Sequence, residues 1–265
     1  MTMKRTNIVI LLLILVSNTP VAKSEISMTR NPADVALGAN SALVYVNIYG
    51  VIDNGDAEKL SAYIDNLRKK IDHPISIIAK LNSAGGNVDA SLQIGKMFRQ
   101  HKALAEVGGN SICASACVFI LAGAIGRIVE GKVLIHRPYD PNDQITNPEK
   151  QKEKYQLLKA TIAKYLNSVN VPVRLYDDML RISPSGAKTL SKTELESYSL
   201  SGNDPYFSEA TAVSIAQKLG ISREEYIRRE VLAREVCDSM DLPENLGSPV
   251  WKTWAECHNR IMGHK

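Results

Sequence analysis

The sequence lacks an apolar run long enough to cross a lipid bilayer. The run at residues 8–16 has nine residues, whereas a membrane-spanning helix needs about 20. We therefore expect no stable membrane anchor in the mature protein. Because Lys4 and Arg5 precede this run and a small-residue pattern ending at Ser24 follows it, residues 1–24 are predicted to be a signal peptide and the protein to be exported, either to a periplasm or out of the cell.

The protein also has little net charge once the signal peptide is removed. The signal peptide carries Lys4, Arg5 and Lys23 and no acidic residue, so the remaining 241 residues hold 29 basic and 28 acidic side chains, a formal charge of +1. Without a basic patch we expect no nucleic-acid partner. The phosphate-loop pattern G-x4-G-K-[ST] is absent as well, and we expect no cofactor.

Cysteines are few, and all four lie beyond the signal peptide. In an oxidising compartment an even number predicts disulfides, and Cys237 with Cys257 is the favoured pair. Cys113 and Cys117 stand two residues either side of Ser115. A bridge between them and inert packing are both open, and a reactive thiol ranks third. A zinc site is disfavoured because no histidine pair lies near these cysteines, and we expect no metal.

Alternating apolar patterns predict an α/β domain. Strands are expected at residues 42–48, 75–81, 104–107, 125–129 and 132–136, with helices between them and one buried helix at residues 114–122. Repeated β-α-β and β-β-α units imply a mostly parallel sheet whose ligand site lies at the carboxyl ends of the strands. Residues 25–40 are expected to be an extended lead-in, residues 41–201 the α/β domain, and residues 202–265 a C-terminal helical extension.

Four residues in this domain suggest hydrolytic chemistry. Ser115 opens the predicted buried helix, where unpaired backbone N–H groups and the helix dipole favour negative charge. Gly86 can bring its backbone N–H close to a substrate, and with the N–H of Ala116 it could form an oxyanion hole. His136 ends a predicted strand and could act as the general base.

Three motifs carry a resemblance to a known family. N-S-A-G-G-N-V at residues 82–88, A-S-A at 114–116 and L-I-H-R-P at 134–138 resemble the proteolytic subunit of the Clp protease, within the Clp/crotonase superfamily. The 29-residue separation of Gly86 and Ser115 matches that family's spacing. The chain looks most similar to exported members, whose serine lies in a C-x-S-A-C motif.

The resemblance covers roughly residues 42–200 and implies a ClpP/crotonase-like fold. It also assigns roles: Ser115 as the nucleophile, His136 as the base, and Gly86 with Ala116 as the oxyanion hole. It further implies a peptide or protein substrate and a homo-oligomer.

The third member of the triad is missing from the matching position. Where the family has an aspartate, this sequence has Ala187. Asp177, Asp178 or Ser185 could orient His136 only if the intervening loop were rearranged. Loss of the orienting acid typically costs about 10⁴ in turnover. The chain therefore has a slow Ser–His dyad, or a substitute residue, or no catalysis.

The sequence thus favours an exported serine hydrolase, in particular a peptidase. The alternative, motivated by Ala187, is a non-catalytic member of the fold that binds a peptide or protein partner in the same groove. A crotonase-type enzyme acting on acyl thioesters ranks below both. An exported protein would rarely meet a coenzyme A substrate, and that reaction leaves Ser115 and His136 unexplained.

Overall fold

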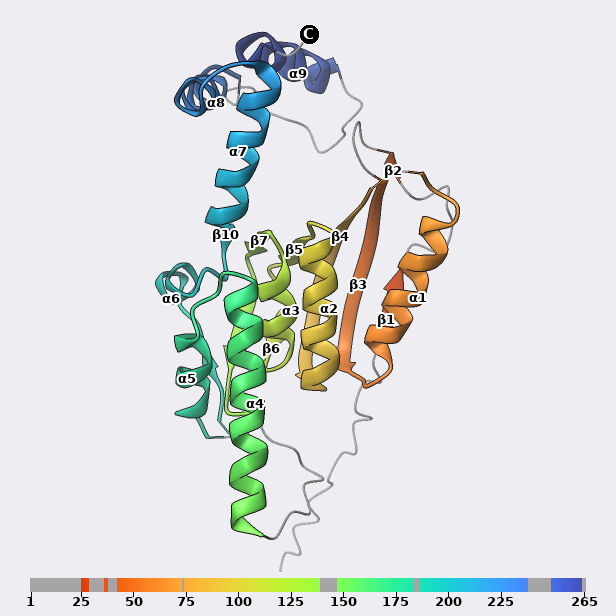
Figure 1. Ribbon diagram of the computed structural model, residues 1–265, viewed down its shortest axis with the longest axis vertical. Helices are drawn as coiled ribbons and strands as arrows, with labels where there is room; N and C mark the ends of the chain where they lie inside the picture. Colours follow the sequence, from red (N-terminus) through yellow and green to blue (C-terminus); the bar gives the residue numbers. More distant parts are fainter. Residues whose placement is uncertain are drawn as a thin grey trace, which may run out of the picture.

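The computed structural model describes residues 25–28, 36–37, 42–72, 74–138, 147–183, 186–237 and 249–263. The predicted signal peptide, most of the predicted lead-in and Ser185 lie outside these residues. Figure 1 shows a twisted sheet flanked by helices, with a helical arm leading away from it to the C-terminus. None of the described helices is both long and apolar enough to span a membrane.

The described strands form one mixed sheet. Their order is β10-β7-β5-β4-β6-β8-β9, and β3 pairs with the other edge of β4 and carries β1 and β2. Pairs among β3 to β8 are parallel, whereas β1, β2, β9 and β10 are antiparallel additions. The strands are β1 (Glu25–Met28), β2 (Ala36–Leu37), β3 (Ala42–Ile52), β4 (Ile75–Gly86), β5 (Leu104–Val107), β6 (Ile112–Ala114), β7 (Gly126–Val129), β8 (Lys132–Ile135), β9 (Lys188–Thr189) and β10 (Gly202–Asn203).

The long strand β4 divides the sheet into two tiers. Its first half pairs with β5 through Ile78–Lys80, and its second half pairs with β6 through Ser83 and Cys113. Since β5 pairs with β7 and β6 with β8, one tier is β5-β7-β10 and the other is β6-β8-β9. The second tier carries all the predicted catalytic residues at its carboxyl end.

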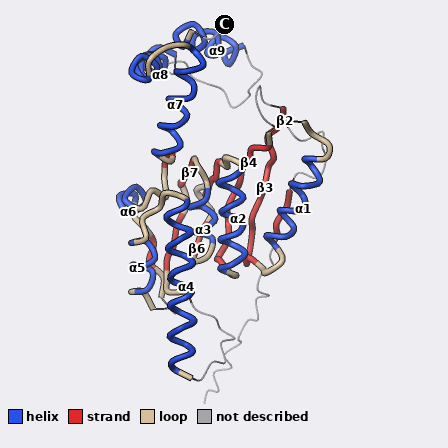
Figure 2. Tube along the Cα trace, viewed as in Figure 1, coloured by secondary structure: helices blue, strands red, loops and turns tan. Residues whose placement is uncertain are grey.

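Helices cover one face of the sheet (Figure 2). They are α1 (Asp56–Arg68), α2 (Val88–Gln100), α3 (Cys117–Gly123), α4 (Pro148–Ser168), α5 (Arg174–Leu180) and α6 (Lys192–Ser197). The helix α3 is buried at every position, because α2 and α4 close over it. A Cβ on Gly95 or Gly123 would overlap neighbouring atoms, and Tyr165 of α4 donates a 2.6 Å hydrogen bond to the carbonyl of Phe119. The helix that follows the nucleophile motif is therefore fixed in the core.

Two local predictions were wrong. Residues 114–122 do not form a single helix, because β6 runs through Ala114 and α3 begins at Cys117. A short apolar run has no periodicity that separates a buried strand from a buried helix. The strand predicted at residues 75–81 continues to Gly86, so Gly85 and Gly86 are the last two residues of β4 and pair with Val51 and Ile52 of β3.

The C-terminal region is helical, as predicted, and has its own small core. It comprises α7 (Pro205–Leu219), α8 (Arg223–Cys237) and α9 (Pro249–Met262). Its buried hydrophobic cluster is small and consists of Ala212, Ala216, Tyr226, Ala233 and Met262, beside the buried Cys237 and Cys257. The disulfide Cys237–Cys257 joins α8 to α9, which confirms the favoured pairing. Because so little apolar area is buried, the bridge is a large part of what holds these helices together.

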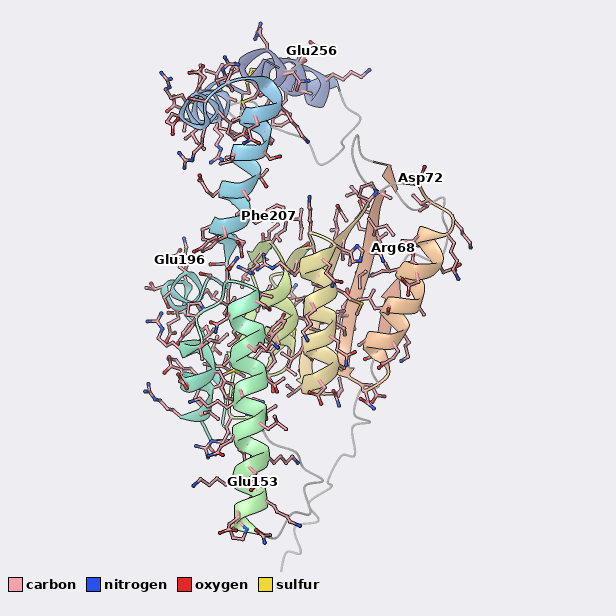
Figure 3. The ribbon with its side chains drawn as sticks, in the orientation of Figure 1. Arg68, Asp72, Glu153, Glu196, Phe207 and Glu256 are labelled. Atoms are coloured by element: carbon pink, nitrogen blue, oxygen red, sulfur yellow. A yellow bond between two sulfur atoms is a disulfide. The ribbon has the colours of Figure 1, made fainter. Side chains whose placement is uncertain are left out.

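Asp204 ties this region to the α/β domain. Its carboxylate caps α7 by accepting from the N–H of Phe207 at 2.9 Å and pairs with Arg99 at 2.8 Å. Asn170 also donates to it. Burial alone would raise the pKa of Asp204, but these hydrogen bonds hold the pKa below its ordinary value. Phe207, at the base of α7 in Figure 3, lies under the ammonium of Lys102.

Candidate active site

The predicted site residues follow three neighbouring strands. Gly86 ends β4, Ser115 follows β6, and His136 follows β8. Since β4 pairs with β6 and β6 with β8, all in parallel, the three carboxyl ends meet at one edge of the sheet. In parallel sheets this edge is where ligands bind. The topology therefore brings Gly86, Ser115 and His136 together.

Ser115 has an unusual backbone conformation. Its φ of 54° lies in the left-handed region, which non-glycine residues seldom occupy and which costs about 1–3 kcal/mol unless the surroundings enforce it. Here its N–H donates to the carbonyl of Leu134 at 2.9 Å, and its own carbonyl accepts from the N–H of Val118 at 3.1 Å. The side chain is partly exposed. Ser115 thus lies on a sharp strand-to-helix turn, one residue before the helix N-cap at Ala116.

A disulfide spans this turn. Cys113 at the end of β6 is bonded to Cys117 at the start of α3, and both residues are buried. Of the three possibilities left open by the sequence, the bridge is confirmed, and no cysteine of the chain is free. The bridge encloses Ser115 in a five-residue covalent loop, so it restrains the turn on which the serine lies.

The glycine pair packs against the serine from the side of β4. A Cβ on Gly85 would stand 2.8 Å from the Cβ of Ser115 and 3.0 Å from the N of Ala116, and one on Gly86 would overlap the carbonyl oxygen of Ile52. Their φ values are 99° and 142°, so both positions need glycine. The sequence assigned a role only to Gly86, whereas Gly85 is the one in contact with Ser115.

Ser83 fixes this glycine segment, a role that the sequence analysis missed. It is buried, donates a 2.6 Å hydrogen bond to the carbonyl of Gly50, and accepts one from the N–H of Gly85 at 3.0 Å. The N–H of Ala116, the predicted second oxyanion donor, has no acceptor among the residues that the structure describes. An unpaired donor next to Gly85 and Ser115 is what an oxyanion hole requires.

His136 is held by the residue that follows it. Its Nδ1 lies 2.9 Å from the carbonyl oxygen of Arg137. A carbonyl oxygen can only accept, so Nδ1 must carry the proton, and in the neutral ring Nε2 is then the nitrogen whose lone pair can accept one. Arg137 is in turn anchored, since its guanidinium donates to the carbonyl of Leu180 at 2.8 and 2.5 Å. After Ser83, Arg137 is the second residue of the site that the sequence analysis missed. It holds His136 through its backbone carbonyl, which no side-chain pattern reveals.

The position opposite His136 carries no carboxylate. In the antiparallel pair of β8 and β9, Leu134 faces Thr189 and Ile135 faces Lys188. Continuing this register by one residue sets His136 against Ala187. The alanine that stands where the sequence motif led us to expect an acid is therefore also the cross-strand neighbour of the histidine.

Three other residues were considered as groups that could orient His136. Asp177 and Asp178 have other partners, and Ser185 lies outside the described residues. Asp177 pairs with Lys159 at 2.9 Å. Asp178 pairs with Arg181 at 2.7 Å through one oxygen and accepts from the hydroxyl of Tyr198 at 2.5 Å through the other. Burial, together with Asp178, raises the pKa of Tyr198 to about 12.

Comparison with known proteins finds a family to which part of the chain is similar. The Clp protease family model matches residues 40–170, a stretch that contains the glycine pair, Ser115 and His136. Over this stretch, just under half of the chain, the sequence is similar to the Clp protease family.

Two solved structures are among those to which the chain is similar. A mutant of ClpP1 from Listeria monocytogenes is 22% identical, with 59% of this chain and 88% of that chain covered and a TM-score of 0.42. A mutant of the membrane-bound stomatin-specific protease 1510-N is 19% identical, with 66% and 86% covered and a TM-score of 0.43. No curated protein sequence matches the chain.

Proposed function

We propose that this protein is an exported serine peptidase that uses Ser115 and His136 without a carboxylate third member. One observation carries the proposal. The serine and histidine follow adjacent parallel strands whose ends are tied together by the hydrogen bond from Ser115 N–H to Leu134. The packing of the glycine pair against the same serine and the match of residues 40–170 to the Clp protease family model support it.

The residues divide the chemistry as follows. Nε2 of His136 takes the Oγ proton of Ser115 as Oγ attacks the peptide carbonyl carbon, and the carbonyl π electrons move to its oxygen. The N–H groups of Ala116 and Gly86 then stabilise that negative charge. The tetrahedral intermediate expels the amine, which takes the proton from His136, and leaves an ester on Ser115. Water, deprotonated by His136, attacks this ester to form a second tetrahedral intermediate. Its collapse breaks the bond to Oγ and releases the acid, and Ser115 Oγ takes the proton back from His136.

The alanine at the position of the triad acid determines the rate of turnover that we expect. The Arg137 carbonyl holds the His136 ring in the tautomer that a base needs, but a carbonyl dipole stabilises the imidazolium less than a carboxylate charge does. Enzymes that lose the acid of a triad slow by about 10⁴ yet retain catalysis. We therefore expect slow turnover with an intact nucleophile.

Labelling with a fluorophosphonate tests the proposal. Folded mature protein should form one covalent adduct, which peptide mapping by mass spectrometry places on Ser115. Ser115→Ala should abolish it, and the matched control Ser111→Ala, four residues earlier on the same segment, should retain it. If folded protein gives no adduct on Ser115, the proposal fails.

A non-catalytic peptide-binding protein is the second candidate, and the alanine opposite His136 favours it. The two candidates predict different behaviour for Ser115→Ala. A peptidase loses turnover but keeps substrate binding, so substrate accumulates uncut. A binding protein shows no turnover in either form, and partner capture is the same for wild type and variant.

Export is proposed from the N-terminal pattern and is supported by the two disulfides, since such bonds persist mainly outside the reducing cytosol. Expression of the full chain in a bacterium with an oxidising periplasm tests it. N-terminal sequencing of the periplasmic product should begin at Glu25. Full-length protein that remains in the cytosol would contradict export.

Assembly into a homo-oligomer is proposed from exposed apolar side chains on the sheet. Tyr45, Ile78 and Leu104 are neighbours in register across β3, β4 and β5. Ile128 of β7 lies two residues beyond Gly126, the partner of Leu104, and is more than half exposed. Such a row of apolar side chains is typical of a protein interface. Sedimentation velocity should show an oligomer that Leu104→Glu dissociates, and a monomeric wild type would contradict the proposal.

A further inference from the structure

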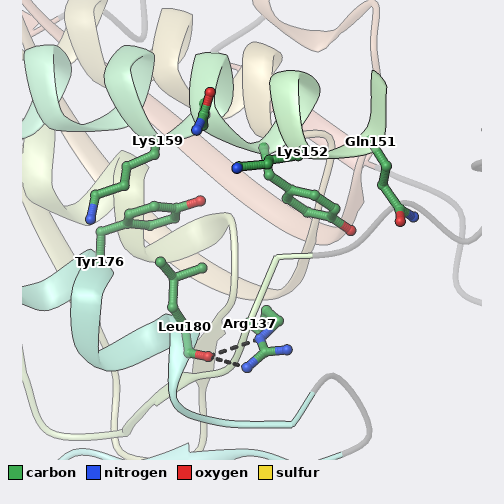
Figure 4. Close-up of a pocket in the computed structure, with 8 residues that line it drawn as sticks. Arg137, Gln151, Lys152, Lys159, Tyr176 and Leu180 are labelled. Atoms are coloured by element: carbon green, nitrogen blue, oxygen red, sulfur yellow. Dashed lines mark hydrogen bonds between the residues drawn. The ribbon is translucent and has the colours of Figure 1, made fainter. Parts of the chain in front are cut away.

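A cavity of about 640 Å³ lies beside the candidate base, between α4 and α5 (Figure 4). Arg137, which lines it, is the residue next to His136, so the cavity begins within one residue of the proposed chemistry. Its volume is in the range that holds a side chain or a small ligand. We expect a cavity in this place to receive part of whatever occupies the site.

Among the described residues that line the cavity, the charged side chains are all cationic. They are Arg137, Lys152 and Lys159, and no aspartate or glutamate of the described ranges joins them. Figure 4 shows the two lysines on α4 across from Arg137. Lys159 is neutralised in part by Asp177. Within the described part of the chain, Lys152 has no charged or hydrogen-bonding partner, and Nη1 of Arg137 has none either.

Arg137 is preorganised to meet an anion. Its Nε and Nη2 are fixed on the carbonyl of Leu180, which holds the guanidinium plane at the cavity wall. A guanidinium that is already oriented loses less conformational freedom when it binds a carboxylate than a free one does. A charge-assisted bond from Nη1 to a carboxylate would complete its set of partners.

The remaining walls are aromatic and aliphatic. The Tyr176 ring is almost fully buried, and burial raises the pKa of its hydroxyl, so it stays neutral. Tyr155 and Leu180 add further apolar surface, and two glutamines complete the rim. Apolar walls with cations at the rim suit a group that has a short apolar stem and an anionic end.

We propose that this cavity is a subsite for a peptide carboxylate, which makes peptides that carry one the favoured ligands. The inference rests on the proposed function in so far as the peptide is also a substrate. The carboxylate is either an aspartate or glutamate side chain or the free C-terminus of the peptide. A lysine or arginine side chain at the same place is disfavoured by the unpaired cations.

Binding measurements on the mature Ser115→Ala protein test the subsite without turnover. Two pairs of fluorescein-labelled hexapeptides separate the sources of the carboxylate: one amidated pair differs as Glu against Gln at the centre, and one Gln pair differs as free against amidated C-terminus. Fluorescence anisotropy should show about tenfold tighter binding of the carboxylate member in one pair. Equal affinities within both pairs overturn the proposal.

Variants on α4 locate the effect. Lys152→Gln should reduce the preference to about threefold, because one of two unpaired cations is lost. Lys150→Gln removes the same charge two residues away on the same helix, outside the cavity, and should keep the tenfold preference. Lys152→Glu should favour a lysine-containing hexapeptide over its glutamate counterpart. Equal losses in Lys152→Gln and Lys150→Gln contradict a cavity site.

The outcome separates this inference from the proposed function. Fluorophosphonate labelling of Ser115 does not require the cavity. Labelling without carboxylate preference would leave the peptidase and remove the subsite. Carboxylate preference without labelling would leave a peptide-binding protein with the subsite in place.

Discussion

The two disulfides of this protein lie in contrasting regions. Cys113–Cys117 is buried in the main core and joins residues four apart around Ser115, whereas Cys237–Cys257 joins residues 20 apart in a region with only a small core of its own. In the chain-entropy description the shorter loop contributes about 2 kcal/mol and the longer about 3 kcal/mol. The short bridge therefore mainly shapes a turn, and the long bridge mainly stabilises a fold.

The largest expected effect concerns the backbone of the site. Gly86→Ala should destabilise the protein by more than about 3 kcal/mol, because a Cβ would overlap Ile52 and the φ of 142° suits only glycine. Urea denaturation measures the loss. Gly109→Ala is the control, since nothing lies within 4 Å of its Cβ position, and it should change stability by less than about 1 kcal/mol. Equal stability of both variants would refute the described packing.

The C-terminal bridge should affect stability but not chemistry. The double variant Cys237→Ala/Cys257→Ala should lower the free energy of unfolding of α7–α9 by about 3 kcal/mol, measured by hydrogen exchange of that region. The rate of fluorophosphonate labelling at Ser115 should stay unchanged. A large fall in that rate would mean that the two regions are coupled, against the contrast drawn above.

Removing the bridge around Ser115 should affect the reactivity of the serine as well as the stability of the protein. Cys113→Ala/Cys117→Ala should cost about 2 kcal/mol of stability and slow labelling at Ser115 about tenfold, because the left-handed turn loses its covalent restraint. The second-order labelling rate constant, at a temperature where both proteins are folded, is the measurement. An unchanged rate would show that the backbone hydrogen bonds of Ser115 suffice to hold the turn.

The smallest effect is expected when an acidic residue is restored opposite His136. Ala187→Asp places a carboxylate opposite His136, and peptide turnover should rise about tenfold, far below the full effect of about 10⁴ for an evolved triad. Ala187→Asn has nearly the same shape without charge and should give no gain. If the two variants behave alike, the register between β8 and β9 does not set the orientation of His136.

The sequence predicted the strands and helices better than it predicted the turn at the site. β-branched runs located β3 and β8, whose strands were predicted at residues 42–48 and 132–136. The strand β6 was hidden inside an apolar run that also suited a helix. The two-residue strands β9 and β10 have too few residues for any periodicity.

Part of the chemistry of the site could be predicted from the sequence. Ser115, His136 and the glycine pair were identified from spacing and resemblance, and the structure brings them together. The left-handed φ of Ser115 was not visible, because serine has no preference for it and tertiary contacts impose it. The hydrogen bond to His136 comes from a backbone carbonyl, which every residue has, so no side-chain pattern could have pointed to Arg137.

The central claim is that His136 activates Ser115 although its cross-strand neighbour is Ala187 and not an aspartate. The most direct test is the rate constant for fluorophosphonate labelling at Ser115, compared between wild type and His136→Ala. General-base assistance is typically worth 10²–10⁴, so we predict a fall of at least about 100-fold in a variant that remains folded. Equal rates in the two proteins, or an adduct on a residue other than Ser115, would contradict the account.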